Sequence, residues 1–171
     1  MSVPTKNLLV ASCACGGVEL EASGAPITSV VCYCDDCQEG SGQIEALPNA
    51  PPVLDSDGGT AYIVYRKDRV NCSKGARLLK GYKIREKSVT NRVVATCCNS
   101  AMFLSFDDAK HWVDVYSSRV KGDIPPVQMR VCAKFKPDTG QVPSDAPLYS
   151  GYSIKFLAKL VAAKIALRLH R

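Results

Sequence analysis

The sequence predicts a mainly β domain that ends in a helix, and three observations support this prediction. Short segments rich in β-branched and aromatic residues recur along most of the chain, separated by turn signals such as Asp57-Gly58-Gly59 and Pro125-Pro126. From Ile154 onward the chain contains neither Gly nor Pro, which favours a helix. Seven of the nine cysteines stand in three tight groups, a pattern typical of metal ligands.

The β core is predicted to consist of short strands without an internal repeat. The predicted strands cover residues 18–21, 27–32, 61–66, 78–84, 91–96, 102–106, 112–116 and 128–136. Strands of this length and spacing are typical of an all-β core. We expect one short helix inside it, over residues 36–46, because the prolines at positions 48, 51 and 52 then force an irregular connection.

The C-terminal part is expected to be distinct from this core. We predict one domain over residues 1–148 and a C-terminal amphipathic helix within residues 149–171, with about four helical turns from Ile154 onward. Its apolar residues form two nearly opposite faces. One face consists of Ile154, Ala158, Val161, Ile165 and Leu169, and the other consists of Phe156, Leu160, Ala163 and Leu167. Such a helix is expected to contact its own core and a second subunit, which predicts a homodimer. Attachment to a membrane surface is disfavoured, because an interfacial helix has one apolar and one charged face.

Composition and charge exclude several classes of protein. With 46% apolar and 22% charged residues, the chain has an ordinary globular composition. The net charge of +6 comes largely from basic residues in the tail, so nucleic-acid binding is not favoured. The apolar run at residues 8–11 is too short for a signal peptide, and no apolar stretch is long enough for a transmembrane segment. We therefore expect a cytoplasmic protein, whose clustered cysteines bind metal rather than form disulfides.

One predicted metal site combines two pairs of cysteines. Cys13 and Cys15 can reach one metal from one strand or loop, because residues two apart on extended backbone project the same way. Cys97 and Cys98 are the available second pair, although adjacent strand residues point to opposite faces. Both can act as ligands only if the backbone bends, which Asn99 tolerates. Four thiolates complete a structural zinc site, and a degenerate or metal-free site is the alternative.

The second predicted site has three sulfurs. Cys32, Cys34 and Cys37 form a C-x-C-x-x-C motif without an obvious fourth ligand. Three protein ligands and an open position are what a catalytic zinc requires. Three thiolates reduce the Lewis acidity of zinc and favour exchange with a soft thiol, so a small thiol-containing substrate is the expected fourth ligand. The isolated Cys72 and Cys132 are expected to be buried small hydrophobic residues.

The residues around this motif leave two alternatives open. Tyr33 and Asp36 are the candidates for moving a proton in a reaction at the open zinc. The other interpretation is that Asp35, Asp36 or His111 closes the site and makes it structural. A lone histidine such as His111 is more often satisfied by ordinary contacts than used as a ligand.

These motifs resemble a known family, the β-tent zinc proteins of the glutathione-dependent formaldehyde-activating enzyme (GFA) group, which includes centromere protein V. The resemblance covers roughly residues 11–106, and it rests on Cys13-x-Cys15-Gly16-Gly17-Val18, on Cys32-x-Cys34-x-x-Cys37 followed by Ser41-Gly42, and on Cys98-Asn99-Ser100-x-Met102-Phe103. It implies layered β-sheets in a β-tent fold and one structural zinc held by the two cysteine pairs. It also implies a catalytic zinc at the C-x-C-x-x-C motif that accepts the sulfur of glutathione.

The activity implied by the resemblance is that of a carbon-sulfur lyase, which condenses formaldehyde with glutathione to S-(hydroxymethyl)glutathione or reverses that reaction. The chain departs from the family pattern at Ala95, so Cys97 must replace the family's first late cysteine. Tyr33 and Gln38 also stand where the family commonly has His and Arg. In these features the chain is similar to a divergent bacterial subgroup with a CYC-x-DC motif. The functions to distinguish are a lyase acting on glutathione or another thiol adduct of a small aldehyde, and a non-catalytic zinc-stabilised β domain that binds a protein partner.

Overall fold

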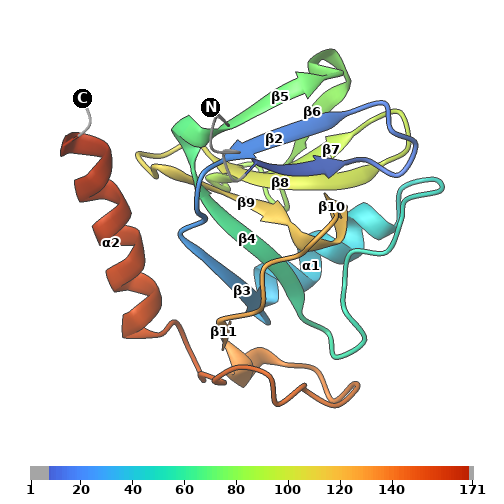
Figure 1. Cartoon of the computed structure of the whole chain (residues 1–171). Coiled ribbons are helices and arrows are strands. Elements are labelled where there is room, and N and C mark those ends of the chain that lie inside the picture. Colours follow the sequence, from blue (N-terminus) through green and yellow to red (C-terminus); the bar gives the residue numbers. More distant parts are fainter. Residues whose placement is uncertain (1–7, 170–171) are drawn as a thin grey trace.

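The computed structural model describes residues 8–169, which form two β-sheets and two α-helices (Figure 1). The larger sheet has seven strands in the order β11 (Met129–Val131), β3 (Thr28–Cys32), β4 (Thr60–Arg66), β9 (Trp112–Tyr116), β8 (Ser100–Phe106), β7 (Thr90–Ala95) and β6 (Leu79–Tyr82). The smaller sheet has four strands in the order β10 (Val120–Lys121), β1 (Leu8–Ser12), β2 (Glu19–Ser23) and β5 (Val70–Lys74). Neighbouring strands are antiparallel except β11 and β3.

The two sheets enclose one apolar core, and strand alternation determines which residues enter it. From the smaller sheet, Leu20 and Ala22 of β2 are buried, whereas the alternating residues Glu19 and Glu21 are only partly buried. From the larger sheet, Ile63 and Tyr65 of β4 pack into the same cluster. Successive side chains of a strand point to opposite faces. Tyr62 and Val64, which alternate with Ile63 and Tyr65, therefore face the other side of the large sheet.

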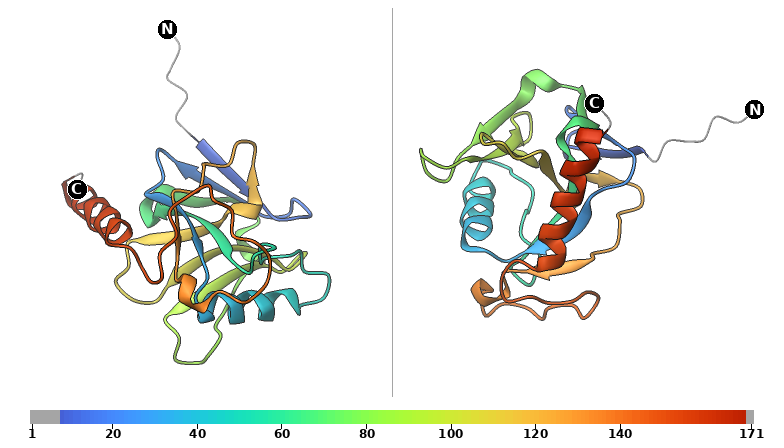
Figure 2. Two further views of the ribbon diagram at one scale, coloured as in Figure 1. Left: turned by 90° about the horizontal axis from the view of Figure 1, so that it is seen from below. Right: turned by 90° about the vertical axis from the view of Figure 1, so that its left-hand side faces the viewer.

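That other side carries the second core and both helices. Tyr62 and Val64 of β4 pack there with Ile44 of α1 (Asp35–Glu45) and Leu160 of α2 (Ile154–Leu169). Two turned views show α2 along one side of the β body (Figure 2). The layered, mainly β fold predicted from the sequence and from the family resemblance is confirmed, and this second core contains the cysteines of the C-x-C-x-x-C motif.

Most predicted elements occur with small shifts at their ends. The strand predicted over residues 112–116 has those bounds, and the helix predicted over residues 36–46 is α1. The strand predicted over residues 128–136 is wrong after Val131, because Cys132 has a left-handed backbone with φ of 61° and a 3-10 turn follows at Ala133–Phe135. The sequence pattern does not predict the strands β1, β5 and β10. β1 is a short apolar run, and β5 is largely polar and exposed.

The C-terminal helix begins at Ile154 as predicted, and it buries one of its two apolar faces. Leu160 is buried in the core, and His111 donates a hydrogen bond from Nε2 to the Leu160 carbonyl oxygen at 2.9 Å. On the opposite face Ile154 is 85% exposed and Leu169 is 79% exposed. Arg171, which is part of the predicted basic tail, lies outside the described residues. No helix in residues 8–169 combines the length and apolar character needed to cross a membrane.

Candidate metal centres

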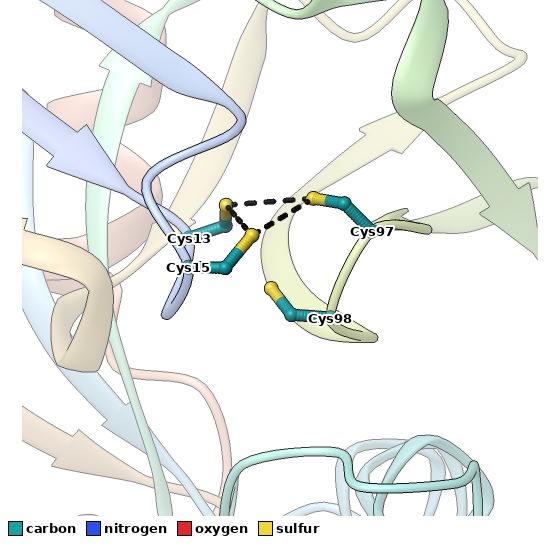
Figure 3. Close-up of side chains that lie close together, drawn as sticks. All are labelled: Cys13, Cys15, Cys97 and Cys98. Atoms are coloured by element: carbon teal, nitrogen blue, oxygen red, sulfur yellow. Dashed lines mark hydrogen bonds between the residues drawn. The ribbon is translucent and has the colours of Figure 1, made fainter.

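Two facing turns bring the first four cysteines together. Cys13 and Cys15 lie in the turn between β1 and β2, and Cys97 and Cys98 lie in the turn between β7 and β8 (Figure 3). Of the two predicted placements, a strand or a loop, the structure shows the loop for Cys13 and Cys15. The Gly16 amide donates to the Cys13 carbonyl oxygen at 3.0 Å, and Gly16 has a φ of +73°, so the backbone turns around the site. A side chain at this left-handed position would strain the turn.

The spacing of these sulfurs fits a tetrahedral metal site. The Sγ atoms of Cys13 and Cys15 are 3.6 Å apart, and Cys97 Sγ lies 3.7 Å from Cys13 Sγ and 3.3 Å from Cys15 Sγ. Zinc–sulfur bonds of about 2.3 Å in a tetrahedron place the sulfurs about 3.8 Å apart. Cys98 completes the group, with all four ligand atoms within 4.8 Å of one another. The predicted bend occurs at Asn99, whose φ is 53°.

The three cysteines of the second cluster lie where β3 leads into α1. Cys32 ends β3, Cys34 is the N-cap of α1, and Cys37 lies in its first turn. Their sulfurs are within 4.8 Å of one another. The amides of Cys37 and Gln38 bond to the Cys34 carbonyl oxygen. The positive end of the helix dipole therefore faces the cluster, and this favours thiolates over thiols.

Negative charge in this cluster is concentrated on one sulfur. Hydrogen bonds from Cys32 and Cys37 lower the pKa of the Cys34 thiol to about 3, and the nearby Arg92 adds a smaller effect in the same direction. The Tyr62 hydroxyl donates to Cys37 Sγ at 3.5 Å. The cluster is thus an anionic site surrounded by donors, which suits a cation.

Cys132 borders this second cluster. The sequence did not reveal this position. It is buried as expected, yet it also contacts Cys32, and hydrogen bonds with Cys132 and then Cys34 raise the pKa of Cys32. The contact arises because β11 pairs in parallel with β3, which places Val131 opposite Cys32. Cys132 is not part of the compact three-sulfur group. Cys72 lies elsewhere, with its Sγ bonded to the Lys74 carbonyl oxygen.

Tyr33 fixes the cysteine loop instead of facing a substrate. Its hydroxyl donates to Asp57 Oδ2 at 2.6 Å and accepts from Arg130 Nη1 at 2.8 Å. Its carbonyl oxygen accepts a hydrogen bond from Gln38 Nε2 at 2.6 Å. Tyr33 is fully buried and does not line the cavity beside the cysteines. The idea that its hydroxyl moves a proton at the metal is therefore wrong, because this hydroxyl is held in a buried ion-pair network.

A cavity of about 350 Å³ opens beside the second cluster. Its walls are mainly apolar, and one side is lined by Tyr152, which precedes α2, and by Phe156, Leu157 and Leu160 of α2. Polar groups enter it from Asp36, Thr90, Arg92, Lys110 and Asp114. Within residues 8–169, no carboxylate or imidazole joins the three sulfurs as a fourth ligand. Asp36 lines the cavity but pairs with Arg85 at 3.2 Å, and His111 bonds to α2.

Arg92 and Asp114 are the cavity residues that the sequence analysis missed. The signal for Asp114 was a carboxylate in the centre of the apolar strand Trp112–Tyr116. Arg92 offered a weaker signal, since it stands at the start of the apolar part of β7. Its guanidinium is buried, with Nη2 donating to the Asp36 carbonyl oxygen. Arg92 therefore places a positive charge next to the anionic cluster.

The position of Arg92 depends on a glycine in α1, which leads to a testable prediction. A Cβ atom at Gly40 would overlap Nε and Cζ of Arg92, whereas a Cβ atom at Gly42 would meet nothing within 4 Å. We expect Gly40→Ala to destabilise the protein by about 1–3 kcal/mol through overpacking. Gly42→Ala should be neutral or stabilise α1 by up to about 1 kcal/mol. Urea unfolding of both variants measures the difference, and equal stabilities would contradict the proposed packing of Arg92 on Gly40.

Comparison with known proteins agrees with the cysteine pattern. Residues 8–51 match the family model of the glutathione-dependent formaldehyde-activating enzyme, and this stretch contains Cys13, Cys15 and the second cluster. A crystal structure of a Rhodobacter sphaeroides protein is similar at 16% identity and a TM-score of 0.48, covering 68% of this chain and 91% of that chain. No curated protein matches the chain. The match over residues 8–51 agrees with the resemblance to the GFA family in the part of the chain that carries the first two cysteine motifs.

Proposed function

We propose that this protein is a carbon-sulfur lyase of the GFA type, which acts on glutathione or on another thiol adduct of a small aldehyde. The observation that carries the proposal is the second cluster, in which three sulfurs border a cavity and no carboxylate or imidazole of residues 8–169 joins them as a ligand. The match to the GFA family model includes these three cysteines, which supports the same reaction class. The cavity volume of about 350 Å³ falls within the usual range of small-molecule sites.

We propose different metal roles for the two clusters. Cys13, Cys15, Cys97 and Cys98 would hold a structural zinc, because four sulfurs at tetrahedral spacing leave no open position. Cys32, Cys34 and Cys37 would hold a second zinc, which when bound lowers the pKa of an incoming thiol and accepts its sulfur. Cys34 contributes the most acidic thiol to this set.

The protein groups around the second cluster account for how a thiolate could approach. With zinc bound, Asp35 and Asp36 would add negative charge beside three thiolates, which should repel an incoming thiolate. Arg85 pairs with Asp36, and the buried Arg92 lies against the same helix turn. Lys110 brings another positive charge to the cavity wall. Arg85 and Arg92 offset the acidic loop, whereas Lys110 is paired with Asp108. The apolar wall of α2 limits the access of water to the sulfur.

The experiment that tests the proposal is cobalt substitution followed by thiol titration. Cobalt(II) reports its ligands through visible absorption, so glutathione that enters the coordination shell should change the spectrum. We expect this change in the wild type and in Cys72→Ser, since Cys72 lies outside both clusters. It should be lost in Cys37→Ser. Formation of S-(hydroxymethyl)glutathione from formaldehyde and glutathione is then measured on the zinc-loaded wild type.

A single observation favours the alternative function, a non-catalytic zinc-stabilised domain that binds a protein partner. The outer face of α2 exposes Ile154, Leu157, Val161, Ile165 and Leu169. A homodimer through this face would bury it, and we retain that as the proposed partner contact. A cobalt spectrum that does not change when glutathione is added would favour this alternative, because an interaction module has no need of an open metal position.

We also propose a cytoplasmic location. It is consistent with the nine cysteines, which all lie in the described residues and form no disulfide there.

A further inference from the structure

Asp114 places a carboxylate on the cavity side of the large sheet. It lies on β9, opposite Val64 of β4 and Leu104 of β8. Val64 and Leu104 belong to the core that contains the second cysteine cluster, whereas Val113 and Val115 pack in the core between the sheets. Alternation along β9 thus directs Asp114 into the cavity, and Asp114 is one of its lining residues.

The carboxylate has no structural role that explains its burial. Asp114 Oδ1 is buried without a hydrogen-bond partner among the described residues. Lys110, the cation whose charge acts on Asp114, forms its ion pair with Asp108 instead. A buried oxygen without a partner costs free energy, so such a group is typical of a site completed by a ligand. Burial raises the pKa of Asp114 to about 7, with a smaller opposing effect from Lys110.

Asp114 and the cysteines face one cavity from different strands. Tyr116 lies two residues after Asp114 on β9, about 6.8 Å further along the strand. Tyr116 is opposite Tyr62 of β4, and the Tyr62 hydroxyl contacts Cys37 Sγ. Asp114 is thus too far from the sulfur cluster for direct contact, and the separation is of the length that a small molecule can span. A substrate whose sulfur lies at the cysteines can place an oxygen near Asp114.

We propose that Asp114 exchanges the proton with the aldehyde-derived oxygen of the substrate. In the condensation, the thiolate sulfur forms a bond to the carbonyl carbon, the π electrons move to oxygen, and this oxygen takes the proton of the Asp114 carboxyl group. In the reverse direction the Asp114 carboxylate removes the hydroxyl proton, the carbonyl re-forms, and the carbon–sulfur bond breaks to release thiolate. Asp114 thereby acts as a catalytic residue, and this assignment rests on the proposed lyase function.

The other charged and titratable groups of the cavity come from several elements. They are Cys32, Cys34, Asp36, Cys37, Tyr62, Arg92, Lys110 and Tyr152. Tyr116 adds a buried hydroxyl without a partner among the described residues, and burial raises its pKa. Of these groups, Asp114 is the carboxyl group whose Oδ1 has no hydrogen-bond partner among the described residues and whose pKa lies at about 7. Asp36 is already paired with Arg85.

The first test is the pH dependence of turnover in Asp114→Asn. With formaldehyde and glutathione, we expect kcat to fall by about 10²–10⁴-fold, the usual contribution of acid–base catalysis. The wild-type pH profile should bend near pH 7, and this limb should be absent in the variant. Metal content and the cobalt–glutathione spectrum should be unchanged. Asp108→Asn serves as the control, because it removes a neighbouring carboxylate that is outside the cavity. Full turnover in Asp114→Asn overturns the proposal.

A binding measurement separates this proposal from the lyase function itself. The stable thioether S-(2-hydroxyethyl)glutathione carries a hydroxyl but cannot undergo cleavage. We expect its affinity to fall about tenfold or more in Asp114→Asn, and its wild-type affinity to vary between pH 5.5 and 8.5. If wild type binds this compound through Asp114 but never forms S-(hydroxymethyl)glutathione, the lyase function fails while Asp114 keeps its role in contacting the ligand oxygen. Equal affinity in both proteins across this pH range overturns the role of Asp114.

Discussion

The Cys97→Ser variant is expected to lose most of the stability of the fold, although Cys97 is an exposed residue. Removing an exposed sulfur costs little packing, so a large effect must come from the metal. Structural zinc contributes about 10–16 kcal/mol in small zinc domains, and native domains are stable by only about 5–15 kcal/mol. A loss of about 5 kcal/mol would already lower Tm by about 10–20 °C in a domain of this size.

The control for this prediction is Cys72→Ser, which changes the same side chain outside both clusters. Its Tm should stay within about 2 °C of wild type, as for most surface substitutions. A strong zinc chelator added to wild type should lower Tm at least as far as Cys97→Ser does, and it should lower the Tm of the variant by a smaller amount, because the variant retains only the second zinc. The structural role of the four-cysteine site is refuted if Cys97→Ser has the same Tm as fully zinc-loaded wild type.

The second large effect is expected from Asp57→Asn, which removes one charge from a buried network. Asp57 is 2% exposed, and it accepts hydrogen bonds from Tyr33, from Arg130 and from the Gly59 amide. The Arg130 side chain is 6% exposed. Removing one partner of a buried ion pair typically costs about 3–5 kcal/mol, because the remaining charge stays buried. We expect a loss of this size in urea unfolding.

The same substitution should reach the second metal cluster through Tyr33. This residue stands between Cys32 and Cys34, and its hydroxyl is held by Asp57 and Arg130. We therefore expect Asp57→Asn to lower the zinc affinity of the second cluster as well as the stability. Both effects follow from one displaced tyrosine, so they should appear together.

Asp145→Asn provides the matched control, because Asp145 contacts the same arginine from the surface. It accepts from Arg130 Nε at 2.9 Å, but its side chain is 48% exposed. Exposed ion pairs contribute no more than about 1 kcal/mol, so this variant should remain close to wild type in stability and zinc affinity. Equal losses in Asp57→Asn and Asp145→Asn would mean that burial of the Asp57 pair is not what stabilises the loop.

Local patterns were sufficient for most of the secondary structure and for the cysteine motif. β9 has the predicted bounds, because its apolar and aromatic residues are consistently favourable for a strand. The three sulfurs of Cys32, Cys34 and Cys37 converge because a helix begins within the motif and brings its first turn back over Cys34. The end of the strand predicted over residues 128–136 was wrong, since the left-handed backbone of Cys132 is not indicated by residue type.

Contacts between distant segments set the limit of the sequence analysis. Nothing local in the sequence places Cys132 beside Cys32, because the parallel pairing of β11 with β3 determines that contact. The same holds for Arg92 and Asp114, which reach one cavity from β7 and β9 across Leu104 of β8. A register shift of one residue would move each side chain to the other face of the sheet.

The sequence by itself determined the mainly β class, the three groups of closely spaced cysteines and the two apolar faces of α2, because these depend on the spacing of near neighbours. Only the tertiary structure decided which face of α2 is buried, that Tyr33 is held away from the cavity, and that Asp114 faces it with an Oδ1 atom that no group of residues 8–169 hydrogen-bonds. These features depend on strand register and helix packing between residues far apart in the chain, and the side chains acquire their charge state and accessibility only when those segments meet.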